Sequence, residues 1–122
     1  MKKLALVGAL VTAAAFVAYP QAGDPLDSLT VCKDTQKLIF ENSFVRVIDD
    51  SIPVGGTEAL HRHRHGVVVY LSDYTAESIN ADGTKSGGPR KASGAAWSEA
   101  VVHQVKNTGS TVSHAIRIEL KF

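Results

Sequence analysis

Three closely spaced histidines, in "HRHRH" at residues 61–65, are the side chains of this chain best suited to chemistry. Imidazole nitrogens are common ligands of divalent transition metals and also accept protons near neutral pH. On a β-strand, successive side chains point to opposite faces, so His61 and His63 share one face with Cα atoms about 6.6 Å apart. Two imidazoles at this spacing can bind one ion through bonds of about 2.1 Å. Arg62 and Arg64 point to the other face, where we expect solvent exposure.

Two further histidines are candidates for the same site. On a straight strand His65 would lie about 13 Å from His61, so it reaches the same ion only if the chain bends. Gly66 makes such a bend feasible. His103 lies in "VVHQVKN" at residues 101–107, where alternation places it on an apolar, core-directed face. The predicted metal ligands are His61, His63, His65 and His103.

Short β-strands must position these histidines, because alternating or β-branched apolar patterns recur along the chain between turn signals. These patterns lie at residues 44–49, 67–71, 75–79, 101–107 and 114–120, with one edge strand expected within residues 85–94. The run "VVVYL" at 67–71 predicts a strand buried on both faces, and "NADG" at 80–83 predicts a hairpin turn. No window after residue 23 has a sustained helical period, although residues 34–40 could form one turn. The pattern predicts a small all-β sandwich or barrel.

The first residues of the chain are typical of an export signal. Lys2 and Lys3 precede an apolar, small-residue run at 4–18, which is shorter than the roughly 20 residues of a membrane span. We therefore expect a periplasmic or secreted protein, with an uncleaved N-terminal anchor as the alternative. The predicted organisation is a signal peptide at 1–22, an N-terminal extension at 23–40 and a β-barrel domain at 41–122.

Composition excludes some classes of partner and of stabilising bond. Removal of Lys2 and Lys3 from 13 basic residues, against 12 acidic ones, leaves a small negative charge. We therefore expect no nucleic-acid partner, and no stable membrane insertion once the signal is removed. Cys32 is the only cysteine, so an intramolecular disulfide is impossible and a packed, unreactive thiol is expected. A domain this small must then rely on a well-closed core, a metal or an oligomer interface.

Residues around the histidines extend the metal-binding pattern. Gly55, five residues, then "HRH" at 61–63 resembles the first half of the first cupin motif. His103 with Asn107 resembles the end of the second cupin motif, and "GAAW" at 94–97 resembles its glycine-and-tryptophan start. Much of the chain therefore resembles a single-domain cupin, of the small exported or stand-alone kind.

This resemblance, which covers residues 41–122, implies a compact jelly-roll β-barrel with its ligand site inside. It implies that His61, His63 and His103 hold a divalent transition metal, which could be Fe, Zn, Ni, Cu or Mn. It also implies a homodimer, since similar cupins are often dimers.

The sequence departs from the cupin pattern in its fourth ligand. The cupin glutamate falls on Val67 or Val68 here, and the second motif is shorter than usual and lacks its proline and glycine. His65 is the best substitute, whereas nothing in the sequence fixes the directions of Glu58 and Glu99. An all-histidine site is neutral and suits zinc, copper, nickel or iron(II).

Three functions fit these observations, and the sequence leaves open whether the protein is an enzyme. The first is a metal-dependent oxygenase or isomerase acting on a small molecule. The second is a non-enzymatic module that binds a small ligand or a metal, and the third is a barrel that has lost its metal. Tyr70 and Trp97 are candidates for lining a pocket, and His114 is expected to face the core near the end of the barrel.

Overall fold

The computed structural model describes residues 23–122, so the predicted signal peptide at 1–22 lies outside the described residues. The described part contains one short helix and nine strands. In chain order these are α1 (Ser28–Val31), β1 (Gln36–Glu41), β2 (Val45–Ile52), β3 (Thr57–His63), β4 (Gly66–Tyr70), β5 (Tyr74–Asn80), β6 (Lys85–Arg90), β7 (Ala95–Ser98), β8 (Val101–Asn107) and β9 (Ser113–Leu120). The all-β prediction is confirmed, and the expected edge strand within 85–94 is β6.

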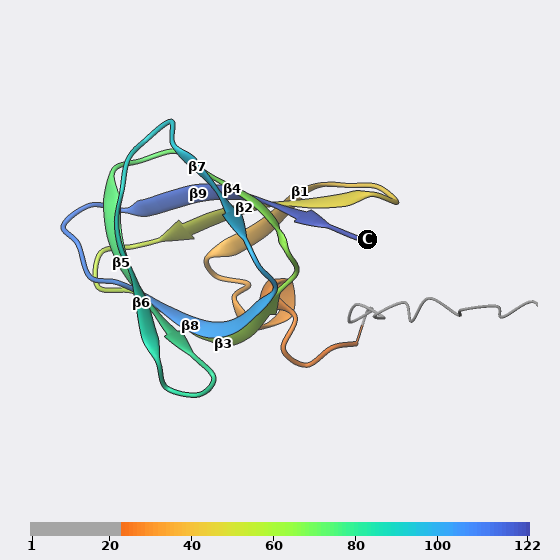
Figure 1. Cartoon of the computed structure of the whole chain (residues 1–122), viewed down its shortest axis with the longest axis horizontal. Helices are drawn as coiled ribbons and strands as arrows, with labels where there is room; N and C mark the ends of the chain where they lie inside the picture. The colour runs from red at the N-terminus through yellow and green to blue at the C-terminus, as the bar shows by residue number, and fades with distance from the viewer. Residues whose placement is uncertain (1–22) are drawn as a thin grey trace, which may run out of the picture.

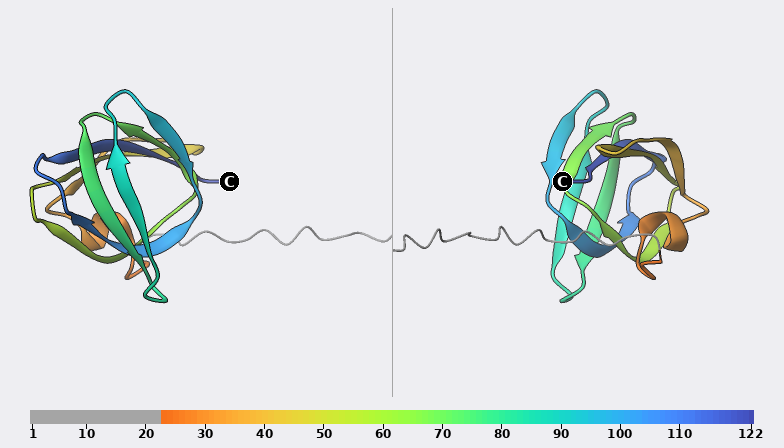
Figure 2. Two further views of the ribbon diagram at one scale, coloured as in Figure 1. Left: turned by 60° about the vertical axis from the view of Figure 1, so that its left-hand side comes forward. Right: turned by 90° about the vertical axis from the view of Figure 1, so that its right-hand side faces the viewer.

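The strands form two antiparallel sheets. The five-stranded sheet has the order β1-β2-β9-β4-β7, and the four-stranded sheet has the order β3-β8-β5-β6. Figures 1 and 2 show the two sheets curving around a common interior, with β9, β2 and β4 in one wall and β3, β8 and β5 in the other. This arrangement confirms the predicted jelly-roll barrel.

Gly66 marks the point where the chain passes from one sheet to the other. It begins β4 in the five-stranded sheet, directly after β3 has ended at His63 in the four-stranded sheet. A Cβ atom at this position would lie 1.9 Å from the carbonyl oxygen of Ile118 in β9, so the close approach of the two strands requires glycine. The predicted bend is present, and it moves the chain between the sheets.

The N-terminal part of the described chain differs from its prediction. Residues 34–40 form no helical turn, because β1 begins at Gln36 and pairs with β2. The five-stranded sheet therefore begins before residue 41, the expected start of the barrel. The single helical turn is α1, where the Asp27 side chain accepts a hydrogen bond from the backbone N–H of Leu29 over 3.0 Å. No helix within residues 23–122 is long and apolar enough to cross a membrane.

Strand β9 corrects the predicted direction of His114. The buried positions of β9 include Ala115 and Glu119, so the interior receives its odd-numbered residues. His114 belongs to the opposite face, where its side chain is 37% exposed and its Nε2–H donates to Asp49 Oδ1 over 2.7 Å. The prediction was wrong because it assumed an apolar interior, whereas this barrel directs polar side chains inward.

Two further expectations concern burial. The thiol of Cys32 is buried and free, and burial raises its pKa to about 12, which agrees with a packed thiol. The strand over "VVVYL" is β4, whose residues after Gly66 are only half-buried, so burial on both faces is not observed. Alternate valines of β4 instead face the interior and the outside of the five-stranded sheet.

Candidate metal centre

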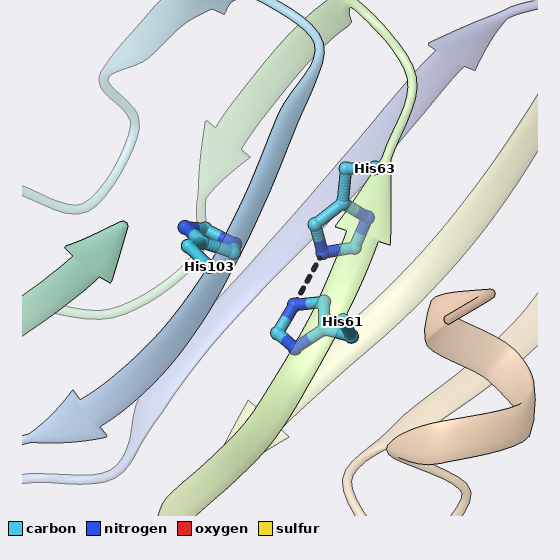
Figure 3. Close-up of side chains that lie close together, drawn as sticks. All are labelled: His61, His63 and His103. Carbon is cyan, nitrogen blue, oxygen red and sulfur yellow. Dashed lines mark hydrogen bonds between the residues drawn. The ribbon is translucent and has the colours of Figure 1, made fainter. Parts of the chain in front are cut away.

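Three of the predicted ligands meet inside the barrel. His61 and His63 come from β3 and His103 comes from β8, where His61 and His103 are direct cross-strand partners. Their exposed fractions are only 0%, 2% and 7%. Figure 3 shows the three rings pointing toward one another, and one nitrogen from each lies within 4.8 Å of the others. Imidazoles far apart in the sequence therefore converge on one point, as the alternation predicted.

Hydrogen bonds at Nδ1 determine which nitrogen of His61 and His63 carries the proton. His61 Nδ1 lies 2.7 Å from the carbonyl oxygen of Ala59, and His63 Nδ1 lies 2.6 Å from Glu119 Oε1. A carbonyl and a carboxylate oxygen accept hydrogen bonds, so Nδ1 is the donor in both rings. Each neutral ring therefore directs the lone pair of Nε2 toward the centre of the group.

The Nε2 atoms of His61 and His63 are only 3.0 Å apart. With Nδ1 protonated in both rings, neither Nε2 has a hydrogen to donate, and two lone pairs face each other in a buried place. Two nitrogens bound at right angles to one ion, with bonds of about 2.1 Å, also lie about 3 Å apart. The donor set therefore fits a shared cation, which would turn this repulsion into attraction.

His103 completes the donor set. Its Nδ1 lies 2.7 Å from the hydroxyl of Ser78, which can accept the Nδ1 proton. Its Nε2 is buried and has no hydrogen-bond partner among the described residues. Such an unsatisfied buried nitrogen is rare in proteins, and a metal ion would satisfy it.

The environment keeps all three imidazoles neutral, as metal ligands must be. Burial lowers the pKa of His103 to about 3, with further contributions from the charges of His61 and Arg117. Burial lowers the pKa of His63 well below its ordinary value, and the charge of Arg117 adds to that effect. The pKa of His61 is also lowered, mainly by burial.

Glu119 orients His63 from the opposite sheet, and the sequence reasoning missed this role. Its side chain is fully buried, with Oε1 on His63 Nδ1 and Oε2 accepting from Arg46 Nε over 2.9 Å. Arg46 also forms an ion pair with Asp27 over 2.7 Å. Burial raises the pKa of Glu119, while the charge of Arg46 opposes that shift. The available signal was a charged residue within an otherwise apolar strand pattern, although the sequence did not show which face of that strand is inside.

The structure does not bring His65 to the other three histidines. His65 lies between β3 and β4, where the chain changes sheets, and its ring stacks on Trp97 with 5.7 Å between ring centroids. Glu99 is also directed elsewhere, because it accepts a hydrogen bond from Trp97 Nε1 over 2.8 Å. His65 was expected to join the group through a bend at Gly66, but this bend carries the chain into the other sheet and does not turn His65 toward the other histidines.

Glu58 faces the interior because β3 contains a bulge. The register with β8 shifts between Glu58 and His61, which brings both side chains to one face despite their odd spacing. Glu58 Oε2 lies 3.7 Å from His61 Nε2, but Glu58 groups with Cys32 and His61 rather than with the three histidines. Val68, one of the two positions where the cupin glutamate was expected, lines the cavity without offering a ligand atom. The described residues therefore supply three convergent ligands.

A cavity of about 380 Å³ adjoins the histidines. His63 and His103 form part of its wall, and Tyr70 lines it as predicted. Trp97 also borders the cavity, but the strand register places its side chain on the outer face of the sheet, in the row of Val67 and Ile118. Asp50 also lines it, and burial, followed by the charge of Glu58, raises the Asp50 pKa well above its ordinary value. A cavity of this size holds a small molecule directly beside the imidazoles.

Comparison with known proteins identifies similar solved structures. No protein-family model and no curated protein matches the chain. A cupin domain from Bordetella pertussis Tohama I is 25% identical with a TM-score of 0.65, covering 71% of this chain and 92% of that chain. A cupin superfamily protein from Desulfitobacterium hafniense DCB-2 is 11% identical with a TM-score of 0.52, covering 70% and 74%. KdgF from Halomonas sp. is 11% identical with a TM-score of 0.50, covering 71% and 77%.

Proposed function

The chain belongs to the cupin superfamily, and we propose that it binds one divalent transition metal through His61, His63 and His103 and acts on a small molecule. The observation that carries this proposal is the 3.0 Å separation of the Nε2 atoms of His61 and His63. Because their Nδ1 protons are already donated to oxygen acceptors, a cation is the partner that suits both lone pairs.

A bound metal would supply a Lewis-acidic centre with positions left open for a ligand. The protein's own contribution is to hold three neutral imidazoles in place and to exclude bulk water from them. Since His63 and His103 also line the cavity, a molecule bound there lies next to the ligand set. Val68, which also lines the cavity, has no atom that can bind a metal, so a coordination position stays open for an oxygen of the small molecule.

Asp50 favours proton transfer over oxygen chemistry as the reaction class. It lines the cavity, its Oδ1 has no hydrogen-bond partner within the described chain, and its raised pKa keeps it protonated at higher pH than an ordinary aspartate. Asp50 is therefore our candidate for the proton-transfer group of the cavity, which an isomerase requires. Asp50→Asn distinguishes an isomerase from a non-enzymatic binding protein. An isomerase should lose turnover in this variant, whereas a binding protein has no turnover and should keep its ligand affinity.

The metal proposal is tested by elemental analysis of the protein purified without an affinity tag. We expect close to one equivalent of transition metal in the wild type and loss of most of it in His63→Ala and His103→Ala. His65→Ala and His114→Ala are matched controls, because both change a histidine outside the group, and they should keep the metal. Equal metal content in all variants would overturn the proposal.

We also propose that the chain forms a homodimer through the outer face of the five-stranded sheet. Five apolar side chains lie in one cross-strand row on that face, one from each strand: Phe40, Val47, Ile118, Val67 and Trp97. Phe40 is 53% exposed and Trp97 is 55% exposed. A continuous apolar row of this kind is typical of an interface, and a second copy offers the same row in return.

Export remains part of the proposal and rests on Lys2, Lys3 and the apolar run at 4–18. Cell fractionation tests it directly. We expect the protein in the periplasm or the medium, and a variant with Lys2 and Lys3 replaced by glutamate should accumulate in the cytoplasm.

A further inference from the structure

Arg117 lies in the middle of the barrel and faces the cavity. It is paired with Ile48 and Val68 on the neighbouring strands β2 and β4, at the centre of the five-stranded sheet. It lines the cavity together with His63 and His103, which belong to the opposite sheet. A guanidinium group is therefore placed across the cavity from the histidine group.

This guanidinium is almost without partners inside the protein. It makes one hydrogen bond, from Nη1 to Ser98 Oγ over 3.1 Å, and no carboxylate of residues 23–122 forms an ion pair with it. Guanidinium has five N–H donors, so most of them lack an acceptor in the protein. Arg46, also inside the sheet, differs in being bonded to both Asp27 and Glu119. Buried charges normally have such partners.

The neighbouring carboxyl groups do not fill this role. Glu119 is bonded to Arg46, and Glu58 Oε1 accepts from Gln36 Nε2 over 3.1 Å. Asp50 is held toward its neutral form by burial and by the charge of Glu58, against the opposing charge of Arg117, and no ion pair or hydrogen bond joins Asp50 to Arg117 within residues 23–122. Val68, the cross-strand neighbour of Arg117, has no acceptor to offer. Arg117 therefore presents its unused donors to the cavity.

We propose that Arg117 is an anion-binding subsite that holds the carboxylate of a small organic acid and directs its other end toward His63 and His103. The fork of guanidinium N–H groups matches the two oxygens of a carboxylate. Arg90 and Glu99, which also line the cavity, have opposite signs, and Asp50 is held toward its neutral form, so Arg117 leaves one unbalanced positive charge among the protein groups of the lining. In the metal-free protein, a singly charged carboxylate suits this balance better than doubly charged phosphate.

The proposal rests on the proposed function only for the direction of the ligand, since the carboxylate itself is bound by the protein. An organic acid with a second oxygen group, such as a hydroxy acid or an oxo acid, would place that oxygen beside the imidazoles. Asp50 would then lie in the same cavity, where it can exchange a proton with the ligand.

Calorimetric titration of the full chain tests the subsite. The probes are acetate, lactate, pyruvate, inorganic phosphate and propylene glycol, which is an uncharged analogue of lactate. We expect saturable binding of lactate or pyruvate, with phosphate and propylene glycol at least about tenfold weaker. Arg117→Lys keeps the charge but loses the fork, and should raise the Kd of the carboxylate at least about tenfold. Arg62→Gln, a change of an arginine outside the cavity lining, is the matched control and should leave the Kd unchanged.

Repeating the titration after chelation separates this inference from the metal proposal. If the purified protein holds no metal but carboxylates still bind in an Arg117-dependent way, the metal proposal fails and the subsite stands. If metal is stoichiometric but no carboxylate binds, or binding is the same in Arg117→Lys, the subsite is overturned. Should the variant fail to fold, NMR of the wild type decides, because carboxylate binding must shift the Arg117 Nε–Hε resonance and an unchanged resonance overturns the proposal.

Discussion

The inner and outer faces of β9 have opposite chemistry, although one strand supplies both. Arg117 and Glu119 point into the barrel, and Ile116 and Ile118, which alternate with them, lie on the outer face of the five-stranded sheet. On the inward face, Glu119 is bonded to Arg46 and His63, and Arg117 faces the cavity. The outward face carries the apolar row that we assign to a dimer interface. Over residues 116–119 of this strand, the usual arrangement of an apolar interior and a polar exterior is reversed.

This difference shows what each face depends on. An inward polar group is stable only while its partner is present, because an unpaired buried charge is costly. An outward apolar group depends on no single neighbour, so its replacement costs little within one copy of the chain. Changes on the inner face should therefore affect stability and ligand binding, and changes on the outer face should affect association.

The largest expected effect comes from removing Glu119. Glu119→Ala leaves Arg46 without its buried partner and should lower the free energy of unfolding by about 3–5 kcal/mol. Ile118→Ala, the adjacent outward-facing change, should cost only about 1–2 kcal/mol because this side chain is half-buried. Urea unfolding of both variants measures the difference. Equal losses would contradict the contrast between the two faces.

Acid should destabilise the metal-free protein through the buried histidines. The folded pKa of His103 is about 3 and its ordinary value is 6.5, so between these values the unfolded chain binds more protons than the folded chain. Stability due to His103 is therefore complete above pH 6.5 and is lost as the pH falls toward 3. His103→Gln should reduce the slope of stability against pH by about 1.4 kcal/mol per pH unit. Chemical unfolding in a chelating buffer at a series of pH values measures this slope, and an unchanged slope would refute the assignment.

Ser78 should affect metal affinity without contacting the metal. Ser78→Ala removes the acceptor for His103 Nδ1 and should weaken metal binding about tenfold. Competition with a chelator of known affinity gives the metal Kd. Ser110→Ala changes an exposed serine and should leave that Kd unchanged. A Ser78→Ala protein with wild-type affinity would show that this hydrogen bond does not orient the ring.

The smallest effect on the site is expected from the outer face. Phe40→Lys and Val47→Lys should convert the proposed dimer to a monomer, as measured by sedimentation velocity, while metal content stays the same. Val54→Lys changes an exposed valine outside the row and should leave the dimer intact. A wild-type protein that sediments as a monomer would remove the outer face from consideration as a self-association surface.

Local patterns were enough to predict the strands and the three histidines that converge. Alternation placed His61 and His63 on one face and His103 on a core-directed face, and both assignments are confirmed. His65 was expected to join them through a bend at Gly66, but the bend leads into the other sheet. Alternation also could not orient Glu58, because a bulge interrupts the count. Periodicity is reliable only over an uninterrupted strand.

The predicted parity of β9 was wrong for a different reason. His114 was grouped with Ile116 and Ile118 as core-facing, since apolar residues normally face inward. A sequence cannot show which face of a strand is inside when the interior is polar, because that depends on partners from distant strands. Glu119 is inward because Arg46 and His63 are there to bond it.

The sequence by itself determined the repeated short strands, the turns between them and the histidines that can bind a metal. These follow from local sterics and side-chain alternation, which act over a few residues. Only the tertiary structure decided that His65 lies apart, that Glu119 orients His63 and that Arg117 faces the cavity without an ion-pair partner in the described chain. Those outcomes depend on which strands become neighbours. The neighbouring strands decide whether a buried charged side chain has an ion-pair partner in the protein or remains available to bind a ligand.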